Sequence, residues 1–106
     1  MPKFIFAYHG GKKPETPEEG QRFMAEWRAW FDGLGEAIVD PGNPVGMSKT
    51  VVNGGVEDNG GANPLSGYTI VTADDIDAAA EMAKGCPMVR NGSGSIEVAE
   101  VLNIDM

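Results

Sequence analysis

Residues 65–87, LSGYTIVTADDIDAAAEMAKGCP, contain a complete strand, turn and helix, and this stretch decides the fold. Tyr68, Ile70 and Val71 supply the aromatic and β-branched side chains that favour a strand. Asp74 is then placed to accept hydrogen bonds from the first free N–H groups of a helix. Apolar side chains, most of them alanine, recur at helical spacing and predict a helix that lies close on a sheet: Ile76, Ala79, Ala80 and Ala83.

The sequence also predicts where this helix ends. Gly85 suits a left-handed residue just past the last turn. Pro87 cannot continue the helix, because its nitrogen carries no hydrogen. Strand, turn, helix and stop thus follow one another within 23 residues.

The preceding part of the chain predicts a first strand and a first helix. In residues 3–9, one side of the predicted strand carries Phe4, Phe6 and Tyr8, and the other side carries Ile5, Ala7 and His9. Apolar residues on both sides are typical of a central strand. Thr16, Pro17 and Glu19 form a capping box with proline at the first helical position. Large apolar side chains then recur along one helix face, which Gly33 and Gly35 end: Phe23, Trp27, Trp30, Phe31 and Leu34.

The remaining segments complete the predicted topology. Residues 36–40 and 95–102 are predicted strands, and residues 47–52 are a further candidate. Residues 53–64 hold five glycines and predict a mobile loop or a loose hairpin arm. The order indicates a ferredoxin-like βαββαβ fold of the α+β class, with two helices on one face of an antiparallel sheet. We expect the other face to pair two copies in a homodimer, and Ile5, Ala7 and Ile96 are its candidate residues, depending on the strand register.

Length and charge limit the function classes. With 106 residues, the chain forms one domain, residues 1–106. The net charge of −8 and the scattered Lys and Arg argue against nucleic acid and anionic membranes as partners. The single cysteine fits a reducing compartment, and neither a signal peptide nor a membrane-spanning run is visible. We therefore expect a cytoplasmic protein.

With these elements placed, the chain resembles the YCII-related proteins, including their DGPF branch, of the dimeric α/β-barrel superfamily. The matching segments are residues 30–44 (WFDGLGEAIVDPGNP), residues 66–87 and a last strand that begins SIEV at Ser95. The DGPF tetrapeptide itself is absent, and residues 57–61 (EDNGG) stand in its place.

The resemblance implies a ferredoxin-like protomer and a homodimer that pairs its sheets face to face. The function of most members of this family is unassigned. Some relatives are thought to use a histidine and an aspartate in small-molecule chemistry such as dehydrochlorination, with the histidine in the first helix. Here Met24 stands near that position, and the first helix holds no histidine.

The predicted topology brings several reactive side chains to one rim. His9 ends the first strand and Asp40 ends the second, and the two strands run parallel. The third strand begins at this rim with Ser66 and Tyr68, and the second helix returns Cys86 toward it. His9 as general base and Asp40 as its partner are the candidate catalytic residues. Ser66, Tyr68 and Cys86 are the candidate ligand-binding residues.

Each candidate also has a structural interpretation. Histidines at strand ends are more often structural hydrogen-bonding groups, and Asp40 precedes a Pro-Gly turn. Tyr68 suits a core or an interface, and Cys86 follows the negative end of a helix, where a thiolate is disfavoured. One histidine and one cysteine do not make a zinc site within the chain, so we expect neither metal nor cofactor.

Two functions from different classes remain open. One is a protein that binds a small organic molecule in a cleft, with cofactor-free proton abstraction or elimination if it is an enzyme. The other is a non-catalytic dimeric interaction or regulatory domain. A pocket in which His9 and Asp40 converge would favour the first. A cleft filled by Trp27 and Tyr68 would favour the second.

Overall fold

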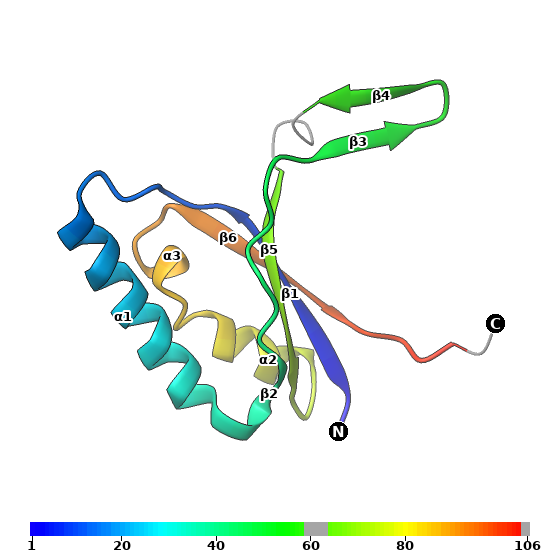
Figure 1. The fold of residues 1–106 in the computed structure, drawn as a ribbon. Helices are drawn as coiled ribbons and strands as arrows, with labels where there is room; N and C mark the ends of the chain where they lie inside the picture. The colour runs from blue at the N-terminus through cyan, green and yellow to red at the C-terminus, as the bar shows by residue number, and fades with distance from the viewer. Residues whose placement is uncertain (59–63, 105–106) are drawn as a thin grey trace.

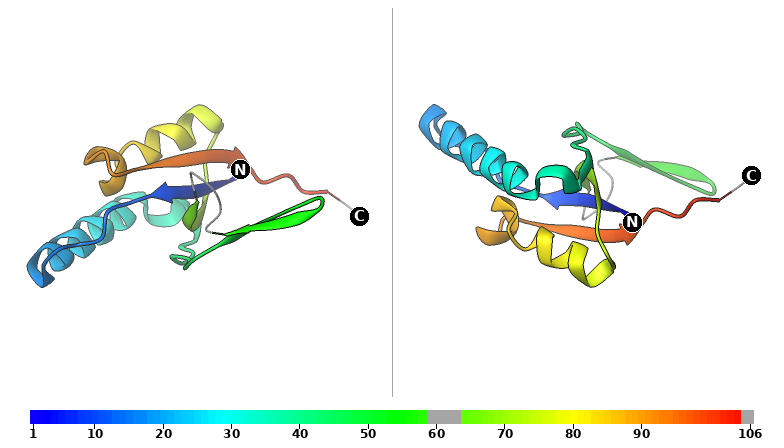
Figure 2. Two further views of the ribbon diagram at one scale, coloured as in Figure 1. Left: turned by 90° about the horizontal axis from the view of Figure 1, so that it is seen from above. Right: turned by 90° about the horizontal axis from the view of Figure 1, so that it is seen from below.

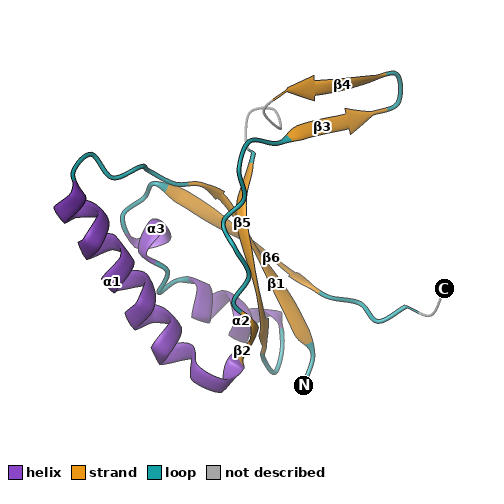
Figure 3. Cartoon of the chain, in the orientation of Figure 1, coloured by secondary structure: helices purple, strands orange, loops and turns teal. Residues whose placement is uncertain are grey.

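Four strands form an antiparallel sheet in the computed structural model, which describes residues 1–58 and 64–104 (Figures 1 and 3). Their order across the sheet is β2-β5-β1-β6. A separate two-stranded ribbon consists of β3 and β4. The strands are β1 (Lys3–Gly10), β2 (Ile38–Asp40), β3 (Lys49–Val52), β4 (Gly55–Asp58), β5 (Leu65–Thr72) and β6 (Gly94–Glu100). The helices are α1 (Pro17–Leu34), the 3-10 turn η1 (Gly35–Ala37), α2 (Ile76–Ala83) and α3 (Pro87–Arg90).

The helices lie together on one face of the sheet (Figures 1 and 2). Helix α2 contacts β6, and the short α3 lies between α1 and β6. This strand order, with helices on a single face, is the ferredoxin-like α+β architecture, so the predicted fold class is confirmed.

Strand β1 divides its side chains between the two faces of the sheet. Phe4, Phe6 and Tyr8 are buried toward the helices. Ile5 and Ala7 lie on the opposite face, where Ile5 is paired with Ile70 of β5 and with Ala99 of β6. We call this second face, with Ile5, Ala7, Tyr68, Ile70 and Ala99, the open face.

The register corrects one residue of the predicted open face. Ile96 lies opposite Tyr8, and Val98 lies opposite Phe6. Directly paired residues share a face, so Ile96 faces the helices and packs against the core. The sequence showed that Ile96 and Val98 share one side of β6, but only the register shows which side.

Helix α1 begins and ends where the sequence predicts. The hydroxyl of Thr16 accepts a hydrogen bond from the Glu19 N–H at 3.1 Å, and Gly35 ends the helix with a φ of 55°. No residue of α1 is fully buried, although its large apolar side chains pack against the core. Trp27 packs edge-on against Tyr8, with 5.3 Å between the ring centroids.

Helix α2 differs in detail from the prediction. Its N-cap is Asp75, whose carboxylate accepts a hydrogen bond from the Ala78 N–H at 2.8 Å, whereas Asp74 precedes the cap.

The residues after α2 also differ from the prediction, because Gly85 does not have a left-handed φ. A Cβ at Gly85 would lie 3.1 Å from Cδ1 of Trp30, so the glycine permits close packing of the indole. Trp30 also donates its ring N–H to the Met82 carbonyl at 3.0 Å. Helix α2 ends at Ala83, and Pro87 is the first residue of α3.

The glycine-rich segment contains a hairpin. Strands β3 and β4 pair through a tight turn at Asn53 and Gly54, in which Gly54 has a φ of 96°. The hairpin-arm interpretation therefore holds for residues 53–58. The predicted strand at residues 47–52 is confirmed as β3, which starts at Lys49. The rest of the predicted loop falls largely on residues 59–63, outside the described residues.

The chain after β2 remains extended along β5. The Val45 N–H donates to the Ser66 carbonyl at 3.0 Å, and the Tyr68 N–H donates to the Asn43 carbonyl at 3.3 Å. Gly42 is where this segment lies closest to β5: its φ is 70°, and a Cβ would overlap the Tyr68 carbonyl oxygen. Only glycine fits this position without a shift of the backbone.

Gly42→Ala should therefore lower the free energy of unfolding by about 3 kcal/mol or more, because a rigid backbone overlap is added to a left-handed φ. Gly46→Ala is the matched control: no atom lies within 4 Å of a Cβ there, and a change within about 0.5 kcal/mol is expected. Urea denaturation measures both values. Equal stability of the two variants would contradict the close approach at Gly42.

Candidate functional site

His9 lies on the same face of β1 as Ile5 and Ala7, at the end of the strand. The pairing of β1 with β5 shifts between Tyr8 and His9, so that His9 is opposite Leu65. On the other side of β1, His9 is opposite Ser95. Nε2 of His9 lies 3.2 Å from a carboxylate oxygen of Glu97, which is exposed.

Sequence reasoning missed Glu97 as the acidic neighbour of His9. Glu97 is paired with Ala7 and lies two residues after Ser95, the direct partner of His9. Glu97 is therefore diagonal to His9 and lies on the same face of the sheet. The signal was present in part, because Glu97 and Ser95 alternate with Ile96 and Val98. The register of β6 against β1 was needed to bring Glu97 next to His9.

The structure does not bring Asp40 to His9. Asp40 is paired with Ile70, five residues along β5 from the partner of His9, which corresponds to about 17 Å along the strand. The carboxylate of Asp40 accepts from the Gly42 N–H at 2.9 Å and so stabilises the turn. The two strand ends do not coincide, because β2 ends in the middle of β5 and the chain continues beside β5.

The other candidates lie in three different environments. Ser66 is half-buried at the start of β5, and Tyr68 is half-buried on the open face opposite Ala7. Cys86 is completely buried in the core under the helices, so its thiol does not reach the rim. Burial raises the pKa of this thiol above its ordinary value.

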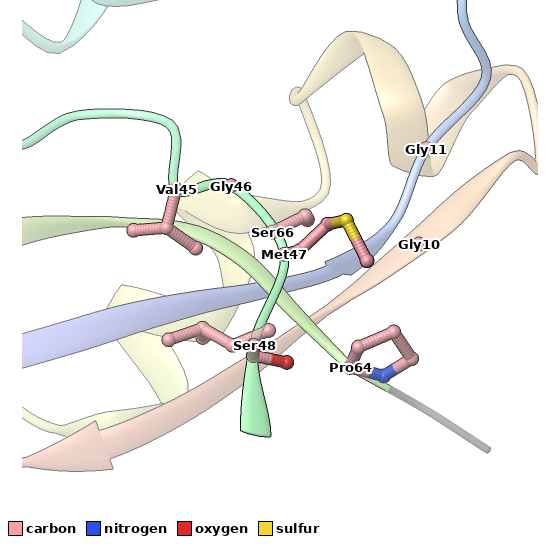
Figure 4. Close-up of a pocket in the computed structure, with 9 residues that line it drawn as sticks. Gly10, Gly11, Val45, Gly46, Met47, Ser48, Pro64 and Ser66 are labelled. Carbon is pink, nitrogen blue, oxygen red and sulfur yellow. The ribbon is translucent and has the colours of Figure 1, made fainter. Parts of the chain in front are cut away.

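A hollow lies near Ser66, at the end of the sheet where β1 ends and β5 begins (Figure 4). We call it the rim hollow; it has a volume of about 360 Å³ and is lined by residues 10–11, 45–48 and 64–66. Figure 4 shows the Met47 side chain extending from the 45–48 segment over this space. His9 precedes Gly10 and lies opposite Leu65, and both of these residues line the hollow.

Two buried hydroxyls near the rim have no hydrogen-bond partner among the described residues. They belong to Ser48, which lines the rim hollow, and to Ser93, which does not. The Ser93 carbonyl accepts from the Gly11 N–H at 2.9 Å, which places Ser93 beside the same end of β1. A buried hydroxyl without a partner costs free energy, so a ligand that bonded to Ser48 would recover that cost.

The space between α1 and the sheet is filled by aromatic rings. Trp27 contacts Tyr8, and Trp30 stacks on Phe6. Tyr68, which would fill this space with Trp27 under the non-catalytic alternative, lies on the opposite face of the sheet. The hydroxyl of Tyr8 donates to Thr69 at 2.6 Å, and the Thr69 hydroxyl donates to the Pro41 carbonyl at 2.9 Å. The rim hollow therefore lies outside this filled space, and a second hollow of about 320 Å³, lined by residues 47–49 and Asp58, adjoins it at Met47 and Ser48.

The residues that the structure describes, 1–58 and 64–104, show neither a metal-ligand cluster nor a membrane-spanning helix. In these ranges no three His, Cys, Asp or Glu side chains gather as metal ligands would. Over the same ranges, no helix combines the length and apolar character needed to cross a membrane.

The fold and site define a class: a ferredoxin-like α+β domain with an uncovered sheet face and a small hollow at its rim. A family profile for the YCII-related domain matches residues 4–105, and the chain belongs to this family. The resemblance inferred from the sequence is thereby confirmed. A comparison with curated proteins found no match.

A solved structure with a similar fold is 5-chloro-2-hydroxyhydroquinone dehydrochlorinase (TftG) from Burkholderia phenoliruptrix AC1100, in complex with 2,5-dihydroxybenzoquinone. The TM-score is 0.56 and the sequences are 17% identical. The similarity covers 93% of this chain and 91% of that chain. At this identity the comparison supports the fold.

The buried acids of the core predict a loss of stability at high pH. Burial raises the pKa of both Tyr8 and Cys86, from ordinary values of 10.0 and 9.0. Above those values the unfolded chain loses protons that the folded chain retains, so the free energy of unfolding falls with pH. Each group contributes a slope of up to about 1.4 kcal/mol per pH unit, and neither contributes below about pH 8.

Tyr8→Phe should reduce the slope above pH 10, and Cys86→Ala should reduce it above pH 9. Urea denaturation at a series of pH values measures this slope. Slopes that stay equal to the wild-type slope in both variants would contradict the raised pKa values.

Proposed function

We propose that this YCII-related protein binds a small organic molecule in the rim hollow. The observation that carries the proposal is the Ser48 hydroxyl, which is buried in the wall of this hollow and has no partner among the described residues. The volume of about 360 Å³ suits a molecule of one or two rings, and pockets of this size commonly combine apolar walls with a few polar groups. The backbone groups of residues 10–11 and 64–66 complete the wall.

We further propose that His9 abstracts a proton from the bound molecule without a cofactor. Its neighbour Glu97 takes the orienting role that the sequence suggested for Asp40, because the carboxylate lies 3.2 Å from Nε2. In this step a C–H or O–H bond of the ligand breaks, the imidazole receives the proton, and the electron pair remains on the ligand. An elimination would follow where that ligand carries a leaving group.

The non-catalytic alternative rests on a different observation. Aromatic side chains occupy the space between α1 and the sheet, and both the open face and the β3–β4 hairpin are uncovered in the single chain. A domain of this form would act through its dimer surface. We infer a homodimer through the open face under either alternative, and we expect a cytoplasmic location because of the single cysteine.

2,5-Dihydroxybenzoquinone, the ligand in the TftG structure, is a suitable first probe. NMR titration should shift the amide signals of residues 10–11, 46 and 66. Ser48→Ala should weaken binding about 10-fold, since a hydrogen bond to a buried hydroxyl contributes about 1 kcal/mol or more. The stability of the free protein should be unchanged or higher, because the variant removes an unpartnered buried group.

Ser93→Ala is the matched control. It removes the other unpartnered hydroxyl, which lies outside the hollow, and should leave the affinity unchanged. Equal effects of the two serine variants, or binding that perturbs none of the hollow's amides, would contradict the proposed site.

Proton abstraction is tested by following exchange of the ring C–H of the same probe with D₂O. The wild type should accelerate exchange, and His9→Gln should abolish the acceleration while leaving binding within about 2-fold. Glu97→Gln should reduce the acceleration about 10-fold or more, in the range that positioned acid–base groups contribute. Binding without accelerated exchange in the wild type would favour the non-catalytic alternative.

A further inference from the structure

The chain exposes more surface than a compact monomer of the same mass. Its accessible surface measures 7408 Å², whereas a compact monomer of this mass exposes about 5700 Å². The radius of gyration is 15.1 Å, against about 13 Å for a compact domain of this length. The excess surface of roughly 1700 Å² is more than the ~800 Å² that each partner buries in a standard interface.

The β3–β4 hairpin projects away from the rest of the chain (Figure 1), and all of its residues except Thr50 are exposed. Val51 and Val56 form a cross-strand pair and are 77% and 60% exposed. Lys49 and Asp58 pair on the same side of the ribbon, with 2.6 Å between Nζ and the carboxylate. An isolated two-stranded ribbon is marginally stable in water, so this hairpin gains stability if another surface covers its valines.

The hairpin and the C-terminal segment extend from opposite ends of the sheet. The hairpin lies near the start of β5, and residues 101–104 follow the end of β6, which pairs with the start of β1. Both project away from the helices in every view (Figures 1 and 2). The C-terminal segment also exposes large apolar side chains: Val101, Leu102 and Ile104.

The open face lies between these two projections, on the side of the sheet away from the helices. We propose that the β3–β4 hairpin is an arm that closes on a second copy of this chain seated on the open face, with Val51 and Val56 as its contact surface. In a two-fold assembly each copy presents the same surfaces, so each arm closes on the other copy.

Three observations favour a second copy as the occupant. The open face and the arm lie on the same side of the chain, so a molecule seated on one is within the span of the other. The excess surface per chain is sufficient for a two-fold interface. The valines of the arm and the central residues of the open face, Ile5 and Ile70, are apolar. Apolar contacts suit a chain of net charge −8, because two such copies repel one another through their charged groups.

The test compares Val51→Lys/Val56→Lys with the wild type by sedimentation equilibrium. Two lysines in place of contact valines should raise the dimer dissociation constant at least about 100-fold. The matched control is Met24→Lys, which adds a charge at a residue of α1 that is 61% exposed, on the helix side of the sheet. This control should leave the dissociation constant within about 3-fold.

A second measurement is independent of mutation. In a dimer assembled from labelled and unlabelled chains, isotope-filtered NOE spectra should show contacts from the Val51 and Val56 methyl groups to the unlabelled copy. A dimer without such contacts, or one that the double variant does not weaken, would overturn the arm. A wild type that stays at the mass of a single chain at 100 μM would also overturn it. The small-molecule proposal is tested separately by ligand binding in the rim hollow.

Discussion

The alternation of side chains along β1 is the constraint on which the rest of this structure depends. As a strand with neighbours on both sides, β1 places Phe4, Phe6 and Tyr8 under the helices and leaves Ile5 and Ala7 on the open face. A shift of one residue would exchange the two sets and expose the aromatic core. The same alternation places His9 at the end of the open face, so the core and the candidate site follow from one strand.

The size of the aromatic side chains explains why the hollow lies at the rim. Trp27 and Trp30 stand between α1 and the sheet, and their contacts with Tyr8 and Phe6 fill the space that a ligand would otherwise occupy. Among the described residues, those that line the rim hollow carry no aromatic ring. Glycines and serines of this lining leave room for a ligand beside the larger Met47 and Leu65.

The extended chain after β2 connects the proposed site to the proposed arm. It follows β5 through hydrogen bonds at Asn43 and Ser66, lines the rim hollow with residues 45–48, and continues directly into β3. Its position depends on Gly42, whose close approach to Tyr68 excludes a side chain. The proposed ligand site and the proposed dimer arm are therefore successive parts of the same segment.

The sequence by itself determined the fold class and the main strands and helices, because caps and alternation act over a few residues: examples are the Thr16 cap of α1 and the apolar alternation of β1. It did not indicate the short helix α3. Only the tertiary structure decided the site. Strand register brought Glu97 to His9, the early end of β2 left Asp40 in a turn, and packing buried Cys86. These outcomes depend on contacts between distant segments, which local residue patterns do not encode.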